Sequence, residues 1–530
     1  IQDTAYDAEG QVLSQIDGRG NVTSMAYDAQ GRMTSKTEAV GTPDAATITV
    51  TYDPQGNVIA RQNARLFTTT ATFSGRNLLL SQTEAAGTPV AATTTYTYSP
   101  TKKVATVTDA LLRTTVNTYG VCCDRLVAVT DPLGFITAMA YDFFGNRTSL
   151  TDANNHATLT TYDARNRPVT ITNAAGETTT LAYLDSAASL SEAAGLGLGS
   201  GADGSAVITT NPRLERSIAI SDGVGRSVRN VDGLGHATTM AYDLPVTDTG
   251  TALVAMTSTD PLAHTITAYQ DGAGRTRVSL DALNKRSTMG FDAAGNRVTW
   301  RDANNIGMDC VFDARNRDVQ CTDTAGAITR KAYDANNNLV ATTDALLKVE
   351  SSIFDPRDRK TSTTDRVPAT TTFTYDAVSN LLSITDAEGG ITLYSYEARN
   401  LLDREVFPNG QTRRTARYYG YDPGRRLTSR TVVGVSLAGT PPATPPSPNE
   451  VTTYKYDDAN RLKIRGYTDS LNDTFGYDTA SRLTSANSAR YANQVARLFD
   501  AAGRLTKETL SFTTAAEAAD LPVSYQYDDD

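Results

Sequence analysis

Hydrophobic residues occur along this chain in short runs that end at Asp, Gly or Asn, and helix-scale periodicity is almost absent. One representative stretch contains a turn at residues 292–296, a strand at 297–300, a second turn at 302–305 and a returning strand at 307–312. The pattern therefore predicts a unit of two strands and two turns, that is, a β-hairpin that repeats.

The turns have a consistent chemistry. Asp stands first, where its carboxylate accepts hydrogen bonds from the backbone ahead of it. Gly or Asn stands three residues later, where a left-handed backbone conformation closes the loop. Asp28 with Gly31 and Asp142 with Gly145 are examples. Most aspartates and glycines of the chain are thus interpreted as turn residues.

The hairpin unit recurs with a period of 21 residues when the chain is aligned on an anchor aromatic that is usually followed by Asp. Of the 22 intervals between successive anchors, 12 are 21 residues long and three are 22. Equivalent aromatics are expected to lie on one face of the sheet and to stack repeat upon repeat. The anchors that best define this stack are Tyr27, Tyr52, Tyr141, Tyr162, Phe291, Phe312, Tyr333, Phe354, Tyr375 and Tyr396.

The repeats predict an all-β fold with about 44 strands in one continuous sheet. At about 4.8 Å per strand such a sheet would run for about 200 Å, and open twisted sheets rarely exceed about ten strands without curling. We therefore expect a coiling sheet, either a spiral shell or a solenoid-like barrel. Residues 1–530 are interpreted as a single array, with loop insertions at 184–220, 434–450 and 511–523; short helical turns are expected within the first and third.

Composition supports this prediction and excludes several function classes. Thr (80 residues) and Tyr (25) suit a pleated, half-buried surface. A net charge of −10 without a Lys/Arg stripe argues against a nucleic-acid partner. No stretch approaches the roughly 20 apolar residues of a membrane span. Both ends of the sequence interrupt the repeat, so flanking segments are expected in a longer polypeptide.

Candidate catalytic residues are interpreted as structural. His156, His236 and His264 occupy nearly the same slot in different repeats, where other repeats carry Asn, Phe, Arg or Lys, so the slot is expected to be an exposed turn exit. Most aspartates open turns, which leaves no pair of carboxyls in unlike environments and no EF-hand loop. The Gly195–Gly201 run lacks the strand and helix of a dinucleotide loop. We therefore expect no enzyme activity, no cofactor and no metal.

The four cysteines form two groups. Cys122 and Cys123 are adjacent in a turn that is one residue longer than usual. Cys310 and Cys321 flank a predicted turn at comparable distances, so a cross-strand disulfide between them is one hypothesis and a pair of free thiols is the other.

Units such as residues 27–33 (Tyr-Asp-Ala-Gln-Gly-Arg-Met) and 52–58 (Tyr-Asp-Pro-Gln-Gly-Asn-Val) resemble the RHS or YD repeats of large bacterial cell-surface and toxin proteins, including Tc-type shells, and of animal teneurins. The resemblance covers essentially the whole chain. It implies a strip of hairpins that spirals into a hollow shell, which in toxin members encloses a C-terminal effector. Toxin relatives end in a self-cleaving core with Asp-Pro-Leu-Gly-type segments. Here Asp131 to Gly134 lies mid-array, so self-cleavage is not expected.

The leading functional hypothesis is a non-enzymatic scaffold of a secreted or cell-surface bacterial protein that encloses or displays flanking segments of the same polypeptide. One alternative is an extracellular fibre or adhesin that self-associates through its edge strands. Another is a carbohydrate-binding surface, which the single Trp makes weaker.

Overall fold

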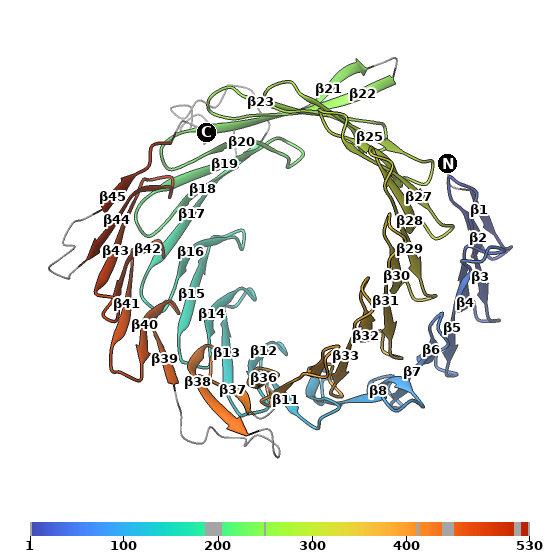
Figure 1. The fold of residues 1–530 in the computed structure, drawn as a ribbon, viewed down its shortest axis with the longest axis horizontal. Helices are drawn as coiled ribbons and strands as arrows, with labels where there is room; N and C mark the ends of the chain where they lie inside the picture. The colour runs from blue at the N-terminus through green and yellow to red at the C-terminus, as the bar shows by residue number, and fades with distance from the viewer. Residues whose placement is uncertain are drawn as a thin grey trace. The chain divides into compact units, whose positions relative to one another are not determined.

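A computed structural model of the chain describes residues 3–185, 204–248, 251–409, 413–436, 450–512 and 521–527. The predicted helical turns at 191–201 and 515–520 lie outside these ranges. Within them, all regular elements are strands, 45 in number, and they form one sheet in which the recorded pairings join consecutive strands in antiparallel fashion (Figure 1). The predicted all-β fold of tandem hairpins in a continuous sheet is confirmed.

The chain divides into two compact units. Unit 1 comprises Ile1–Arg125, Thr130–Gly134 and Arg286–Arg414, and unit 2 comprises the remaining residues. Each unit contains two segments of the continuous sheet, which are called its first and second runs. In unit 1, the first run is residues 3–125 and the second run is residues 286–409; in unit 2, the first run is residues 135–285 and the second run is residues 415–527, within the described ranges.

The first run of unit 1 contains β1 (Asp3–Tyr6), β2 (Val12–Ile16), β3 (Val22–Tyr27), β4 (Met33–Glu38), β5 (Ala46–Tyr52), β6 (Val58–Gln62), β7 (Thr68–Phe73), β8 (Leu79–Ala86), β9 (Ala92–Tyr98), β10 (Val104–Thr108) and β11 (Thr114–Tyr119). The second run contains β25 (Arg286–Phe291), β26 (Arg297–Arg301), β27 (Gly307–Phe312), β28 (Asp318–Asp323), β29 (Ile328–Tyr333), β30 (Leu339–Thr343), β31 (Val349–Phe354), β32 (Lys360–Thr364), β33 (Thr370–Tyr375), β34 (Leu381–Thr385), β35 (Ile391–Tyr396) and β36 (Leu402–Asn409).

The first run of unit 2 follows β12 (Leu126–Thr130) and contains β13 (Ile136–Tyr141), β14 (Arg147–Thr151), β15 (Ala157–Tyr162), β16 (Pro168–Thr172), β17 (Thr178–Leu184), β18 (Ser205–Thr210), β19 (Arg216–Ser221), β20 (Ser227–Val231), β21 (Ala237–Asp248), β22 (Thr251–Thr259), β23 (Thr265–Gln270) and β24 (Thr276–Leu280). The second run contains β37 (Arg413–Tyr421), β38 (Leu427–Ser436), β39 (Glu450–Tyr456), β40 (Leu462–Tyr467), β41 (Asn472–Tyr477), β42 (Leu483–Ser488), β43 (Asn493–Phe499), β44 (Leu505–Phe512) and β45 (Leu521–Ser524).

The two turns of a repeat have the same geometry. In the turn after β25, Asp292 N–H donates to Asn296 O (3.0 Å) and Gly295 N–H to Asp292 O (3.1 Å); the turn after β26 repeats this with Asp302 as its first residue. The Asp292 Oδ1 accepts two more backbone N–H groups. The fourth residue is left-handed, with φ 94° at Gly295. Each repeat therefore presents a first-turn edge, whose turns follow the anchors, and an opposite second-turn edge.

The sheet is thin, and its core is correspondingly small. Among the described residues, the largest side chains that are almost completely buried are Val406 and Val433. Most strand positions are half-buried, with exposed and less exposed residues alternating along strands such as β33. Because few apolar side chains leave water entirely, contacts between neighbouring repeats and between runs must supply much of the order.

Candidate functional site

The anchor tyrosines connect each repeat to the one before it. Tyr162 Oη donates to the carbonyl of Arg147 (2.9 Å), and Arg147 is the residue paired across the hairpin with the previous anchor, Tyr141. The same relation holds for Tyr183 and Pro168 (2.9 Å). It recurs at Tyr27, Tyr52, Tyr242, Tyr333 and Tyr375. The hydroxyl thus satisfies a backbone acceptor one repeat away.

The residue after the first turn makes the second connection between repeats. Arg359 forms an ion pair with the turn carboxylate of Asp355 (2.7 Å), lies 4.9 Å from the ring centre of the next anchor, Tyr375, and donates to Asp376 O (2.8 Å). Cation–π contact and charge-assisted hydrogen bonding act together here. Equivalent arginines over equivalent rings are Arg32, Arg167, Arg226, Arg317, Arg426, Arg461, Arg482 and Arg504.

Asn replaces Arg at this position in other repeats. Asn146 Nδ2 donates to Asp142 Oδ2 (2.8 Å) and to Oδ1 of Asn166 in the next first turn (2.8 Å). These contacts hold the turn carboxylates ionised: the hydrogen bond from the Arg32 side chain lowers the pKa of Asp28, and that from Asn146 lowers the pKa of Asp142. No role for this position was predicted from the sequence. The pattern that indicates it is an Arg or Asn directly after the left-handed Gly or Asn of the first turn.

The two runs of each unit meet at their turn edges. The second-turn edge of the first run faces the first-turn edge of the second run, 265 to 308 residues later in the chain. In unit 1, Figure 1 shows β1 to β6 (blue) beside β27 to β31 (olive). In unit 2, Arg213 contacts Asp478 (3.0 Å) and Glu177 contacts Arg461 (3.0 Å).

A glycine permits close approach at an equivalent point of each unit. A Cβ on Gly18 would lie 2.0 Å from the carbonyl oxygen of Ala293, and a Cβ on Gly233 would lie 2.1 Å from that of Ala501. Both glycines are the second residue of a second turn, and neither has a positive φ. The absence of a side chain, rather than backbone freedom, is therefore what these positions require.

The histidines lie at second-turn exits, four residues after the Asp that opens the turn. His264 Nδ1 lies 3.0 Å from Asp260 Oδ2, and His236 Nδ1 lies 3.4 Å from Asp232 Oδ2. His156 also faces the second run, with Nδ1 2.8 Å from Asn460 Oδ1. Each imidazole is thus a partner of its own turn carboxylate.

Asp131, in the Asp-Pro-Leu-Gly segment, opens an ordinary second turn and accepts the N–H of Leu133 (2.9 Å) and Gly134. It also lies 3.9 Å from the buried guanidinium of Arg399. Over the described ranges, no cluster of three metal-ligating side chains was found. The same residues contain no helix long and apolar enough to cross a bilayer.

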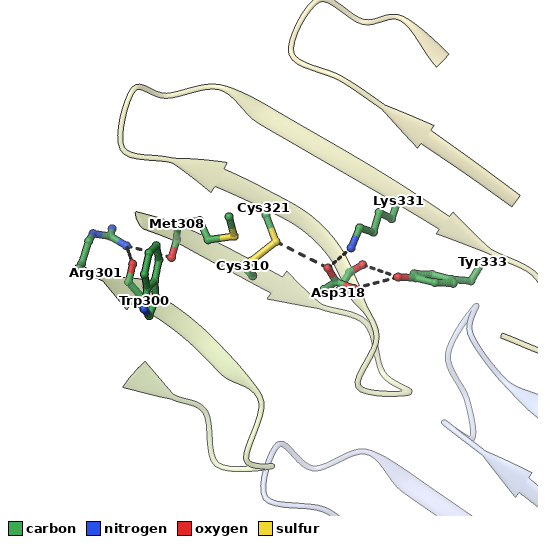
Figure 2. Close-up of a disulfide and its surroundings, with 8 residues drawn as sticks. All are labelled: Trp300, Arg301, Met308, Cys310, Asp318, Cys321, Lys331 and Tyr333. Carbon is green, nitrogen blue, oxygen red and sulfur yellow. Dashed lines mark hydrogen bonds and ion pairs between the residues drawn. A yellow bond between two sulfur atoms is a disulfide. The ribbon is translucent and has the colours of Figure 1, made fainter. Parts of the chain in front are cut away.

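Cys310 and Cys321 are directly paired across β27 and β28 and are joined by a disulfide (Figure 2). Next to it, Asp318 accepts hydrogen bonds from Lys331 Nζ and from Tyr333 Oη (Figure 2). Burial, followed by the Asp318 carboxylate, raises the pKa of Tyr333 to about 12. Cys122 and Cys123 are free and exposed, and their sulfurs lie 2.7 Å apart.

A single sheet of tandem hairpins, coupled from repeat to repeat and docked edge on edge within each unit, defines a β-repeat scaffold. The family model of the RHS repeat matches residues 6–43 and 124–157. These two segments are therefore RHS (YD) repeats, and the remaining hairpins of the array have the same two-strand, two-turn layout.

Solved structures with this fold include TcdB2-TccC3-Cdc42 (15% identity, TM-score 0.58) and TcdB2-TccC3 without its hypervariable C-terminal region (14%, 0.57). The pore form of the Photorhabdus luminescens Tc holotoxin is similar to the same degree (14%, 0.57). Each alignment covers 99% of this chain but 30% of the other chain, so the present chain spans about a third of those structures. No curated protein matches the sequence.

Proposed function

We propose that this chain is a non-enzymatic scaffold segment of a larger secreted or cell-surface bacterial protein, and that it encloses or displays flanking segments of its own polypeptide. The observation that carries the proposal is the edge contact within each unit, which makes a wall from two runs of one strip. Such a wall needs no separate core domain and no cofactor to keep its shape.

The contacts of the described side chains support a structural role in a wall better than a catalytic role. His236 and His264 lie 3.4 and 3.0 Å from the carboxylates of their own turns, and most aspartates take part in turn hydrogen bonds. Shallow clefts lie along the edge contacts, and their ionic side chains already face one another, as Glu38 and Arg315 do in unit 1 and Glu215 and Arg482 in unit 2. Because one similar structure is named for the absence of a hypervariable C-terminal region, a variable segment beyond the repeats is the expected cargo.

Protease protection tests the proposal on the complete polypeptide. If the scaffold encloses its flanking segment, that segment should be cleaved roughly tenfold or more slowly in the intact protein than when produced alone, since cleavage follows the open population. The Gly18→Ala variant, which disturbs the edge contact, should lose part of this protection. Equal cleavage rates for the intact protein and the isolated segment would exclude enclosure.

A further inference from the structure

Two near-identical insertions mark the second-turn edge of the first run in unit 1. Residues 38–43 (Glu-Ala-Val-Gly-Thr-Pro) and 84–89 (Glu-Ala-Ala-Gly-Thr-Pro) lie 46 residues apart. Both fold in the same way: Ala39 and Ala85 are left-handed and almost fully buried, and a Thr hydroxyl caps each alanine carbonyl at 2.7 Å. A conformation that costs energy for alanine is thus built twice.

Each insertion follows an arginine by 19 residues. Arg19 and Arg65 are both the third residue of an ordinary second turn, and they are also 46 residues apart. The duplicated feature is therefore a block that contains one turn arginine and one insertion glutamate, hereafter a docking block.

The first docking block contacts mainly one first turn of the second run and also reaches the carboxylate of the turn before it. Arg19 Nη2 donates to Phe312 O (2.7 Å), and Nη1 donates to Asp313 O (2.9 Å) and to Asn316 Oδ1 (3.3 Å). Its Nε lies 3.6 Å from the carboxylate of Asp292, in the preceding first turn. The planar guanidinium is suited to such a fork of acceptors.

The second docking block repeats every one of these contacts. Arg65 Nη2 donates to Phe354 O (2.8 Å), and Nη1 donates to Asp355 O (2.8 Å) and to Asp358 Oδ1 (2.8 Å). Its Nε lies 3.3 Å from the carboxylate of Asp334, again in the preceding first turn. The two targets are 42 residues apart, which is two repeats.

The insertion glutamates contact the third residue of the same target turns. Glu38 lies 3.2 Å from Arg315, and Glu84 lies 2.7 Å from Arg357. Both arginines are largely buried, with side chains 6% and 10% exposed, and each also donates to a carbonyl of the next first turn. Removal of a glutamate would leave a buried cation without its carboxylate partner.

We propose that the duplicated block is a register-setting docking site whose partner is an RHS first turn of the type aromatic-Asp-x-Arg-Asn/Asp. The arginine recognises the turn by its carbonyls and its left-handed residue, and the glutamate selects turns with Arg in third place. The two copies contact first turns that are two repeats apart, and together they fix the alignment of the first run with the second. This docking site holds the two runs in register whatever the sheet encloses.

The sequence of the facing edge explains why the two docking blocks favour the observed register over one displaced by a repeat. A slip of one repeat in the forward direction would place Asn336 and Val378 opposite the glutamates, and a slip backward would place Ala294 and Asn336 there. None of these residues carries a positive charge, so both ion pairs would be lost together, and the glutamates would face turns whose only charged residue is the opening aspartate. Registers displaced by a single repeat are therefore disfavoured.

A charge-reversal cycle in the full chain tests the first docking block. The reporter is hydrogen exchange of residues 312–317, because the N–H of Ala314 donates to Asp44, directly after the insertion (3.3 Å). Glu38→Arg and Arg315→Glu should each raise exchange there roughly five- to tenfold, and the double variant should exchange more slowly than either single variant. Residues 354–359, held by the second docking block, should be unaffected.

Two matched variants keep the test decisive. Arg76 is the third residue of a first turn on the opposite edge of the same run, so Arg76→Glu should leave exchange of 312–317 unchanged. If charge reversal prevents folding, Glu38→Gln gives a milder loss of the same contact. The proposal is overturned if the single variants leave exchange unchanged, or if the double variant exchanges as fast as the faster single variant.

Discussion

At the scale of single residues, the position after the first turn is where repeats are joined. Arginine and asparagine reach the same next turn by different chemistry: Arg359 contacts the ring of Tyr375 and the carbonyl of Asp376, whereas Asn146 uses one amide nitrogen for two side-chain oxygens. Either residue also holds its own turn carboxylate. The array can therefore alternate between the two without a break in the connection.

Replacement of this residue should loosen two repeats at once. Arg359→Ala removes an ion pair with Asp355 in which both side chains are mostly buried, and also removes the ring contact with Tyr375. We expect a local loss of about 2 kcal/mol, measured as faster hydrogen exchange in residues 355–360 and 375–380. Arg359→Asn should lose less, because Asn serves in the flanking repeats; equal losses would contradict the shared role.

The raised pKa of Tyr333 predicts a loss of folding stability at high pH. Burial and the Asp318 carboxylate raise the pKa of Tyr333 to about 12, whereas an unfolded tyrosine titrates near 10. Because the folded pKa is raised, this contribution to stability is complete below about pH 10 and is lost as the pH rises toward 12. Denaturant midpoints should fall over that window, and fall less in Tyr333→Phe. Identical pH profiles for the two proteins would refute the assignment.

The cysteines should separate into a bonded and a free pair. In the unfolded protein without reductant, a thiol reagent should count two reactive groups, Cys122 and Cys123, and four after reduction. In the folded protein, both exposed thiols should react without reductant. A count of four without reductant would show that Cys310 and Cys321 are not joined.

At the scale of the hairpin, most left-handed turn positions carry Gly or Asn, but some carry leucine. Leu347 has φ 63° and is 73% exposed, and Leu112 has φ 61° and is 85% exposed. A left-handed conformation costs a non-glycine residue roughly 1–2 kcal/mol. These exposed side chains gain little burial in return, so the turns that contain them are locally strained.

Leu347→Gly should relieve this strain. We expect a gain of about 0.5–1 kcal/mol in the local stability of the turn between β30 and β31, after allowance for the greater freedom of glycine in the unfolded chain. Slower hydrogen exchange in residues 344–349 would measure it. Leu346→Gly, at the adjacent position without a positive φ, should give no gain, and an equal gain at both positions would argue against strain as the cause.

Strands and turns were predictable from the sequence because their determinants are local. Asp292, Gly295 and the anchor Phe291 lie within five residues, and together they specify a turn and its bulge. About 44 strands were expected, and 45 are found in the described residues. The tyrosine hydroxyl contacts were not predicted, because a carbonyl 15 residues away is reached only when the twist of neighbouring hairpins is known.

At the scale of the molecule, the edge contacts lay beyond sequence reasoning. They join residues 265 to 308 positions apart, and no local signal states which turn of the second run will face Arg19 or Arg213. The insertions at Glu38 and Glu84 were recognised as copies, but their common purpose appears only when both glutamates are seen to face arginines two repeats apart. The accumulated twist of the repeats brings the two edges together, and the paired contacts of the docking blocks then fix the register.

The glycines at the edges provide a test of this level of organisation in both units. Gly18→Ala would bring a Cβ to 2.0 Å from Ala293 O, and Gly233→Ala to 2.1 Å from Ala501 O, so the runs must separate or shift. We expect each to cost about 1–3 kcal/mol locally and to speed proteolysis or hydrogen exchange in the facing turns, residues 292–296 and 500–504. Gly75 and Gly272 are likewise the second residue of a turn, but on first-turn edges, with open space where a Cβ would stand and no positive φ. Gly75→Ala and Gly272→Ala should therefore be neutral, and comparable losses in all four variants would mean that the glycines act through the turns and not through the docking of the runs.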